Sequence, residues 1–245
     1  MANLVAVSPA HHRQLRILTD QLTASCATVQ LLPVVPAEFA SVATQSPLVL
    51  CKNGQTGQFG FATLLGFYPG ENLFWQQGQF QGLYQPLQLR RQPFFVGDGQ
   101  SPTDVVVCID LTHPAVVAGP ALDQLPPAAA LFDDAGQATV FYQQAQACLQ
   151  QLLHGEDQQR QLVALLLQYE LVQPLLLDIT FGNQQQLRLT GLYTIDEARL
   201  AALPVAAVAQ LHQGGWLAPI YTLLASAAQI YPLIERKNHA LAAAR

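Results

Sequence analysis

Hydrophobic and polar positions follow a strand-like pattern through the first half of the chain. An apolar run at 48–52 is followed by the dipeptide Asn-Gly at 53–54 and by a second apolar run at 58–67. Asn-Gly between two such runs is a strong signal for a β-hairpin. The continuous run rich in β-branched residues at 104–111 is typical of a buried strand. We therefore predict a β-rich half over residues 1–113, made of hairpins and antiparallel sheet.

Shorter elements surround these strands. The Ser-Pro step at 8–9 favours a helix start, because Ser caps helices well and Pro suits the first helical position. Residues 36–45 are typical of a short helix and residues 73–75 of a short strand. Residues 89–96 predict an extended segment, because the residue before a proline avoids the helical conformation. A polar loop over 97–103 follows.

The pattern changes to helical spacing in the second half. An irregular segment over 114–130 comes first. Apolar residues at intervals of three and four then predict helices over 140–153 and 158–171. Residues 175–181 and 187–193 have the pattern of two strands in a late hairpin.

Three more helices are predicted toward the C-terminus. Thr194, followed by Glu three residues later, forms a capping-box pattern that starts the first of them. Another covers 205–213 and ends at two consecutive glycines. The last covers 216–236. We predict that 114–245 is mainly helical and, because no long linker interrupts the chain, that the whole chain forms one α+β domain.

The last predicted helix carries no charge from Trp216 to Ile234. A run of this length could span a membrane. Pro219 and Pro232 interrupt it, however, and polar side chains lie within it. We therefore expect a core helix or an oligomer-interface helix rather than an integral membrane span. If it is an interface, a homo-oligomer forms through this helix.

Charge is scarce in this chain. Only 11% of the residues are charged, while 32 are glutamine, which solvates a surface without adding net charge. The formal net charge is -5 and the pI is about 5.6. A broad basic surface for nucleic acid is therefore not expected, and we predict no nucleic-acid partner.

The cysteines and the first residues bear on the compartment. Cys26, Cys51, Cys108 and Cys148 form no CxxC pair, and we interpret them as buried thiols. The first residues lack the basic region and the long apolar run of a secretory leader. Free thiols without a leader indicate a cytoplasmic protein.

One constellation could hold a metal. His154 and Glu156 match the H-x-E half of a facial iron triad, and His212 could supply the third ligand. Against this, His154 follows a predicted helix, where a histidine is favourable beside the helix dipole. The chain has neither an HExxH motif nor a cysteine cluster. We predict no metal and no other cofactor, and we keep an iron-dependent oxygenase as an alternative.

Arg90 and Arg91 are two adjacent members of a set of only 11 basic residues. On a strand they would point to opposite faces, and one could bind a carboxylate or phosphate. The alternative is an internal ion pair with Asp110 or Asp133. Asp110 ends the predicted buried strand, which is a common place for a functional carboxylate and also for a turn cap.

Several short motifs occur in a characteristic order along the chain. They are Gly-Glu-Asn-Leu-Phe at 70–74, Tyr-Gln-Pro at 84–86, Arg-Arg-Gln-Pro-Phe at 90–94 and Gly-Leu-Tyr-Thr-Ile-Asp-Glu at 191–197. This combination resembles the bacterial SapC family over nearly the whole chain. The family is distinct from the similarly named peptide-transport permease, which needs several spanning helices. One departure is Phe80, at a position where relatives tend to place Trp.

The resemblance implies an accessory role rather than a defined reaction. SapC relatives are often encoded beside TonB-dependent receptors, flavin-dependent halogenase-like proteins and cupin-like proteins. The family name itself comes from an association with a surface-layer locus. These associations suggest a protein that assists in handling an imported substrate, with a nearby halogenase-like or cupin-like enzyme as a partner.

We therefore predict a non-enzymatic binding or accessory protein of a bacterial uptake or substrate-handling system. It would recognise a small molecule, a peptide or a partner protein. The candidate ligand-binding residues are Asn72, Tyr84, Arg90, Arg91 and Asp110. The alternatives are the iron oxygenase with His154, Glu156 and His212, and a surface-layer-associated structural protein.

Overall fold

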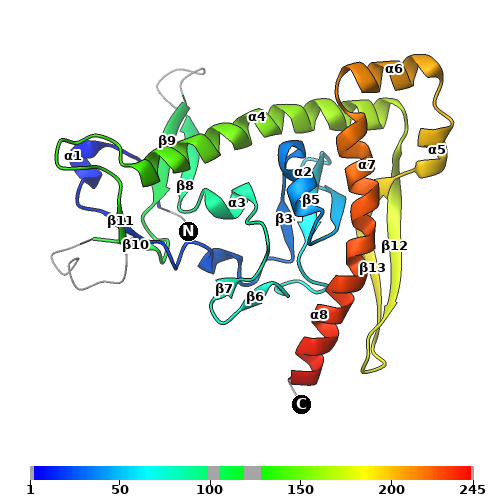
Figure 1. Cartoon of the computed structure of the whole chain (residues 1–245), viewed down its shortest axis with the longest axis horizontal. Coiled ribbons are helices and arrows are strands. Elements are labelled where there is room, and N and C mark those ends of the chain that lie inside the picture. The colour runs from blue at the N-terminus through cyan, green and yellow to red at the C-terminus, as the bar shows by residue number, and fades with distance from the viewer. Residues whose placement is uncertain (1–2, 99–104, 119–127, 244–245) are drawn as a thin grey trace. The chain divides into compact units, whose positions relative to one another are not determined.

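The computed structural model describes residues 3–98, 105–118 and 128–243 (Figure 1). Much of the predicted loop over 97–103 and of the irregular segment over 114–130 lies outside the described residues. An N-terminal half rich in antiparallel strands is followed by a half in which helices predominate, which confirms the α+β class.

The elements of the two halves have the following bounds, with η marking 3-10 turns. The first half contains β1 (Leu4–Ala6), α1 (Pro9–His12), β2 (Arg16–Leu18), η1 (Ala24–Cys26), β3 (Leu31–Pro33), η2 (Pro36–Glu38), α2 (Phe39–Val42), β4 (Leu48–Lys52), β5 (Phe59–Leu64), β6 (Trp75–Gln76), β7 (Gln79–Phe80), α3 (Leu87–Arg90), β8 (Phe94–Asp98) and β9 (Val105–Asp110). The second half contains β10 (Val116–Val117), β11 (Ala128–Ala130), α4 (Val140–Gln168), β12 (Val172–Thr180), β13 (Gln186–Ile195), α5 (Glu197–Ala201), α6 (Val205–Gln213), α7 (Leu217–Ser226), η4 (Ala227–Gln229) and α8 (Ile230–Ala243).

The chain divides into two compact units, each built from several segments. The first unit comprises Met1–Ala27, Trp75–Gln81 and Leu87–Leu153. The second unit comprises Thr28–Phe74, Gly82–Pro86 and His154–Arg245. The expectation of a single domain stays a prediction.

The second unit is built on a five-stranded antiparallel sheet with the order β12-β13-β4-β5-β3. Both hairpins predicted from the sequence are present, as β4–β5 and β12–β13. The apolar core beside the sheet includes Leu50, Phe61 and Leu166, which are fully or almost fully buried. Helix α7 contacts both β4 and β13, so the late helices cover strands from both hairpins.

The first unit contains two three-stranded sheets, with the orders β1-β9-β8 and β10-β2-β11. Strand β9 matches the β-branched run at 104–111, and Ile109 within it is fully buried. Around Ile109 pack Phe94, Phe132 and Tyr142 in one apolar cluster. The aromatic rings meet at angles, with the Phe132 and Tyr142 ring centroids 5.4 Å apart.

The two helices predicted over 140–153 and 158–171 are one helix, α4, of 29 residues. Nothing between the two segments stops a helix, because no proline or capping turn intervenes. Glycine in a helix interior destabilises the helix by about 1 kcal/mol relative to alanine. At position 155, however, the close packing of Val35 leaves no room for a side chain. A Cβ at that position would lie only 2.6 Å from the side chain of Val35.

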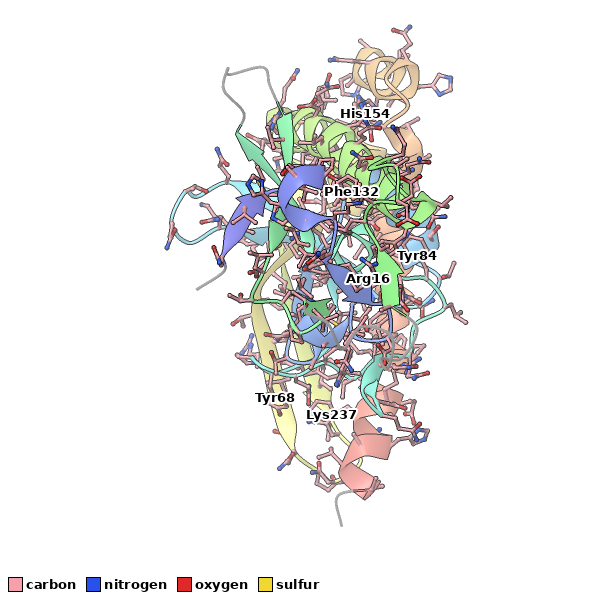
Figure 2. All side chains as sticks on the ribbon, turned by 90° about the vertical axis from the view of Figure 1, so that its left-hand side faces the viewer. Arg16, Tyr68, Tyr84, Phe132, His154 and Lys237 are labelled. Atoms are coloured by element: carbon pink, nitrogen blue, oxygen red, sulfur yellow. The ribbon has the colours of Figure 1, made fainter. Side chains whose placement is uncertain are left out.

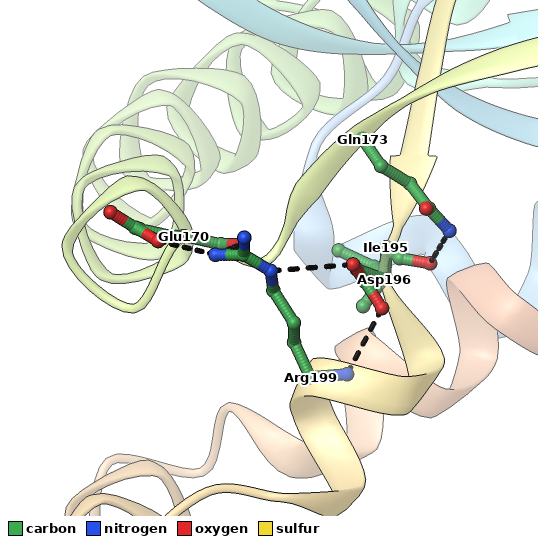
Figure 3. Close-up of polar contacts among 5 residues, drawn as sticks. All are labelled: Glu170, Gln173, Ile195, Asp196 and Arg199. Atoms are coloured by element: carbon green, nitrogen blue, oxygen red, sulfur yellow. Dashed lines mark hydrogen bonds and ion pairs between the residues drawn. The ribbon is translucent and has the colours of Figure 1, made fainter.

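The predicted cap at Thr194 is wrong by two residues. Strand β13 continues to Ile195, which pairs with Val172, so the helix begins later. Asp196 is the N-cap, and its carboxylate accepts a hydrogen bond of 3.0 Å from the Arg199 amide (Figure 3). The Arg199 side chain also pairs with Asp196 and with Glu170, which ties α5 to the end of α4.

Other boundaries differ in smaller ways. The strand predicted at 73–75 is β6, which begins at Trp75. The last helix was predicted over 216–236 and instead runs as α7, the 3-10 turn η4 and α8 as far as Ala243. Within the described residues, this segment is long and apolar enough to cross a membrane by length and composition alone.

The close approach of Gly155 to Val35 yields a test. Replacing Gly155 with leucine should destabilise the fold by about 1–3 kcal/mol, because the added side chain overpacks this contact. Gln151→Leu, at an exposed position of the same helix, is the matched control and should change stability by under about 0.5 kcal/mol. Urea unfolding measures both, and equal midpoints for the two variants would contradict this packing.

Candidate functional site

The backbone of Tyr84 is held by a buried glutamine in the second unit. The Gln45 side chain donates a 2.8 Å hydrogen bond to the Tyr84 carbonyl and accepts a 3.0 Å hydrogen bond from the Tyr84 amide. The Gln45 side-chain amide thus both donates to and accepts from the Tyr84 backbone, as the backbone of a neighbouring strand would. Tyr84 lies in the segment 82–86, which we call the Tyr84 segment (Figure 2).

The Tyr84 side chain reaches a buried carboxylate. Its hydroxyl donates a hydrogen bond of 3.2 Å to Glu38, which is only 3% exposed. The other oxygen of Glu38 accepts a hydrogen bond from the Val35 amide, where the turn η2 begins. Leu83, one residue before Tyr84, is 89% exposed. The Tyr84 segment therefore has fixed backbone and a large apolar side chain in solvent.

Asn72 lies in the Gly-Glu-Asn-Leu-Phe motif and has a role within the loop. Its side-chain oxygen accepts a hydrogen bond of 2.9 Å from the Phe74 amide, which closes an Asx turn. Glu71 accepts a 2.7 Å hydrogen bond from the Phe67 amide. Gly70 has a φ of 83°, the left-handed conformation that glycine adopts without strain. These contacts fix the shape of the loop.

Helix α8 contacts this loop through charged side chains. Lys237 donates a hydrogen bond of 2.5 Å to Glu71, and the two side chains are only 13% and 18% exposed. The Lys237 ammonium also lies 4.9 Å from the centre of the Tyr68 ring (Figure 2). Arg236 stacks over Phe74 at 4.3 Å. Two cation–π contacts and one largely buried ion pair therefore attach α8 to the loop.

Arg90 and Arg91 do not lie on a strand, contrary to the prediction. Arg90 ends the helical turn α3, and strand β8 begins only at Phe94. The Arg91 guanidinium donates hydrogen bonds to Gln88 and to the Phe94 carbonyl, and it stacks 4.1 Å from the Phe95 ring centre. Arg91 thus joins the turn to the strand, whereas Arg90 is exposed.

Asp110 caps the end of β9 in the first unit. Its carboxylate accepts hydrogen bonds from the Asn3 amide and from the amide and hydroxyl of Thr112. Desolvation opposes the charged form, but these hydrogen bonds and the nearby His113 outweigh it, so the pKa of Asp110 lies below its ordinary value. Among the described residues, these contacts take the place of the ion pair between Asp110 and an arginine that was the alternative for Arg90 and Arg91.

His113 is buried beside Asp110. Its Nδ1 accepts a hydrogen bond of 3.1 Å from the Ala115 amide, and its Nε2 has no hydrogen-bond partner among the residues that the structure describes. Burial disfavours the imidazolium and lowers the pKa of His113, with Asp110 acting in the opposite direction. The imidazole is therefore held neutral at pH values where an exposed histidine begins to protonate.

The candidate residues are divided between the units. Asn72 and Tyr84 belong to the second unit, and Arg90, Arg91 and Asp110 belong to the first. All of them except Arg90 have side chains in hydrogen bonds to their own chain that maintain local structure. A ligand-binding role for this set stays a prediction.

The iron triad is not assembled by the described residues. His154 and Glu156 are exposed on α4, and His212 is exposed on α6. His154 contacts Gln158 through its Nε2. Within the part of the chain that the structure describes, no three His, Cys, Asp or Glu residues form a group that could hold a metal ion. The geometry therefore does not favour the oxygenase alternative.

A shallow pocket lies where α8 meets the turn of the β12–β13 hairpin. Its volume is about 180 Å³, and it is lined by Gly182, Asn183, Asn238, Leu241 and Ala242. Asn238 accepts a 2.8 Å hydrogen bond from the Gly182 amide across its floor. A pocket of this size is smaller than the sites of roughly 300–1,000 Å³ that enclose drug-sized ligands.

Sequence reasoning missed the residues that hold the Tyr84 segment. The Pro-Ala-Glu order at 36–38 carries a weak signal for Glu38, since a glutamate early in a helical turn commonly bonds back to the preceding amide. Gln45 gave no signal, because its partner lies 39 residues away. Neither position belongs to the motifs that suggested the family.

The fold is that of an α+β protein with motif-rich loops and no assembled metal centre among its described residues. The SapC family model matches residues 7–233, so the chain belongs to the SapC family. No curated protein and no solved structure matches it. The family assignment made from the motifs is therefore confirmed.

The Glu71–Lys237 pair can be measured by a double-mutant cycle. Glu71→Gln, Lys237→Met and the double variant should give a coupling energy of about 1–3 kcal/mol, because both charges are largely shielded from solvent. The matched control is the exposed pair Asp178–Arg188, for which we expect less than about 1 kcal/mol. Equal coupling in the two cycles would show that the Lys237 contact is an ordinary surface pair.

The buried His113 gives a pH dependence. Because its pKa in the folded state lies below 6.5, the unfolded chain takes up the proton first, and stability falls as the pH drops below about 6.5. His113→Asn should flatten this decline while its side-chain oxygen still accepts from Ala115. His239→Asn, at an exposed position, should leave the decline unchanged. Thermal unfolding between pH 7.5 and pH 5 checks this, and parallel curves for all three proteins would refute it.

Proposed function

We propose that this SapC protein is a non-enzymatic binding protein that presents the Tyr84 segment to a peptide or partner protein. The observation that carries the proposal is Leu83, a large apolar side chain that is 89% exposed and directly precedes Tyr84, whose amide and carbonyl are both bonded to Gln45. Isolated exposed leucines are common, but one held on a fixed segment is suited to insertion into a partner's pocket.

The anchoring of the segment supports this role physically. Gln45 and Glu38 contact Tyr84 from within the second unit, which restrains the backbone directly after Leu83. Binding segments that are already ordered retain more of their interaction energy as affinity. In this proposal the hydrogen bonds of Tyr84 hold Leu83 in position for contact with the partner.

The exposed Leu83 side chain favours a peptide or protein as the partner. A projecting apolar side chain is bound by a complementary cavity on the partner. By resemblance to its family, the partner is an enzyme encoded nearby, of the halogenase-like or cupin-like kind, and we place the interaction in the cytoplasm.

Site-specific photo-crosslinking tests the proposal. A benzophenone amino acid replaces Leu83 in one variant and Val140, which is 69% exposed in the first unit, in the control. We expect the variant at position 83 to form a discrete adduct in host cells, and the control to form none.

Competition supplies the second arm. Excess wild-type protein should suppress the adduct, and Leu83→Ser should suppress it at least about tenfold less well, which corresponds to about 1.4 kcal/mol of binding energy. Adducts of identical mass from both positions, or equal competition by wild-type and Leu83→Ser protein, would contradict binding through this segment.

A further inference from the structure

The segment formed by α7, η4 and α8 has apolar residues on two opposite sides. One side includes Ile220, Leu223 and Leu233, which are almost fully buried in the second unit. The other side is open to solvent over a row of residues that we call the exposed stripe. The exposed stripe consists of Ala218, Tyr221, Ala225, Ala228 and Pro232. Figure 1 shows α7 running beside β13, which it contacts.

The exposed stripe has the spacing of a helix-pairing surface. Its members follow one another at intervals of three, four, three and four residues. In an α-helix this alternation keeps side chains facing a second helix that packs at a small crossing angle, and the five residues remain exposed across the 3-10 turn η4. Tyr221 is 55% exposed and the flanking Tyr231 is 72% exposed. Tyrosine is enriched in protein interfaces, where its ring contributes a large contact area.

A helix with two apolar sides is expected to be covered on both. Only 22% of the most apolar window of this segment is buried. The uncovered side is therefore a surface that water solvates poorly, and a second helix would remove it from solvent. At 27 residues the segment is about 40 Å long, which is enough for an extended contact.

The distribution of charge along the segment indicates what kind of surface covers the exposed stripe. No charged residue occurs from Leu217 to Ile234, and the next cations along the chain, Arg236 and Lys237, are engaged by Phe74, Tyr68 and Glu71. Helices that lie on membranes carry lysine and arginine beside their apolar face to meet anionic lipids. A charged partner would likewise find no complementary group on the exposed stripe. The matching occupant is another uncharged helix with the same spacing.

We propose that a second copy of this chain covers the exposed stripe, with the two α7–α8 segments packed antiparallel about a two-fold axis. A two-fold axis places identical surfaces against each other, and here each surface is neutral and repeats at the same interval. The antiparallel orientation also keeps the two Glu235 side chains apart, whereas a parallel pair would place them opposite each other. This interface does not include Leu83, and the proposal does not depend on the proposed function.

Sedimentation velocity on the full-length protein tests the proposal over a concentration series up to about 100 μM. We expect wild-type protein at twice the 26.6 kDa mass of the chain. Ala225→Glu puts an unpaired charge at the centre of the interface and should raise the dissociation constant by about 100-fold or more. Ala209→Glu makes the same substitution at an exposed position of α6 and should leave the dimer intact.

Two controls separate the outcomes. Circular dichroism establishes that Ala225→Glu is folded, which we expect because its side chain is exposed in the single chain. Flotation with neutral phosphatidylcholine vesicles tests a lipid as the occupant. A monomer at all concentrations, a dimer that Ala225→Glu does not weaken, or a monomer that floats with the vesicles would each overturn the proposal.

Discussion

The pairing of β13 with β4 is the contact on which the sheet of the second unit depends. Two residue pairs, Leu192 with Cys51 and Tyr193 with Leu50, join the late hairpin to the early one. The Tyr193 ring also meets the Phe59 ring edge-on, with centroids 4.9 Å apart. Isolated hairpins are marginally stable in water, so joining them into one five-stranded sheet gives both a common core. A few contacts between segments distant in sequence thus determine the architecture of this unit.

The local elements followed from the sequence where local chemistry decides them. The loop at 53–57 closes β4–β5, with the Asn53 side chain accepting from the Gln55 and Thr56 amides, and the glycine pair ends α6 at Gln213. Predictions failed where a distant partner decides the outcome. Asp196 and not Thr194 caps α5, because pairing with Val172 extends β13 to Ile195, and the glycine at position 155 within α4 is explained by the packing of Val35. A single sequence does not contain these pairings in readable form.

The candidate site was predicted less well than the fold. The motifs indicated the correct family and drew attention to Asn72 and Tyr84. They did not reveal that both side chains are engaged in hydrogen bonds that shape their own loops. Leu83, the exposed neighbour, carries no chemical signal in the sequence, because exposure is a property of the folded chain. Apolar residues that stay outside the core can be identified only once the core is known.

The abundance of glutamine has a consequence for how this protein responds to its surroundings. Gln45, Gln159 and Gln173 use their side-chain amides to bond backbone groups of Tyr84, Phe61 and Ile195. These side-chain amides are neutral, so their hydrogen bonds are not screened by salt and do not depend on a titrating group of the glutamine. Ion pairs between exposed side chains, in contrast, weaken as the ionic strength rises. The backbone of Tyr84, beside Leu83, is consequently less sensitive to salt than the ion pairs seen among the described residues.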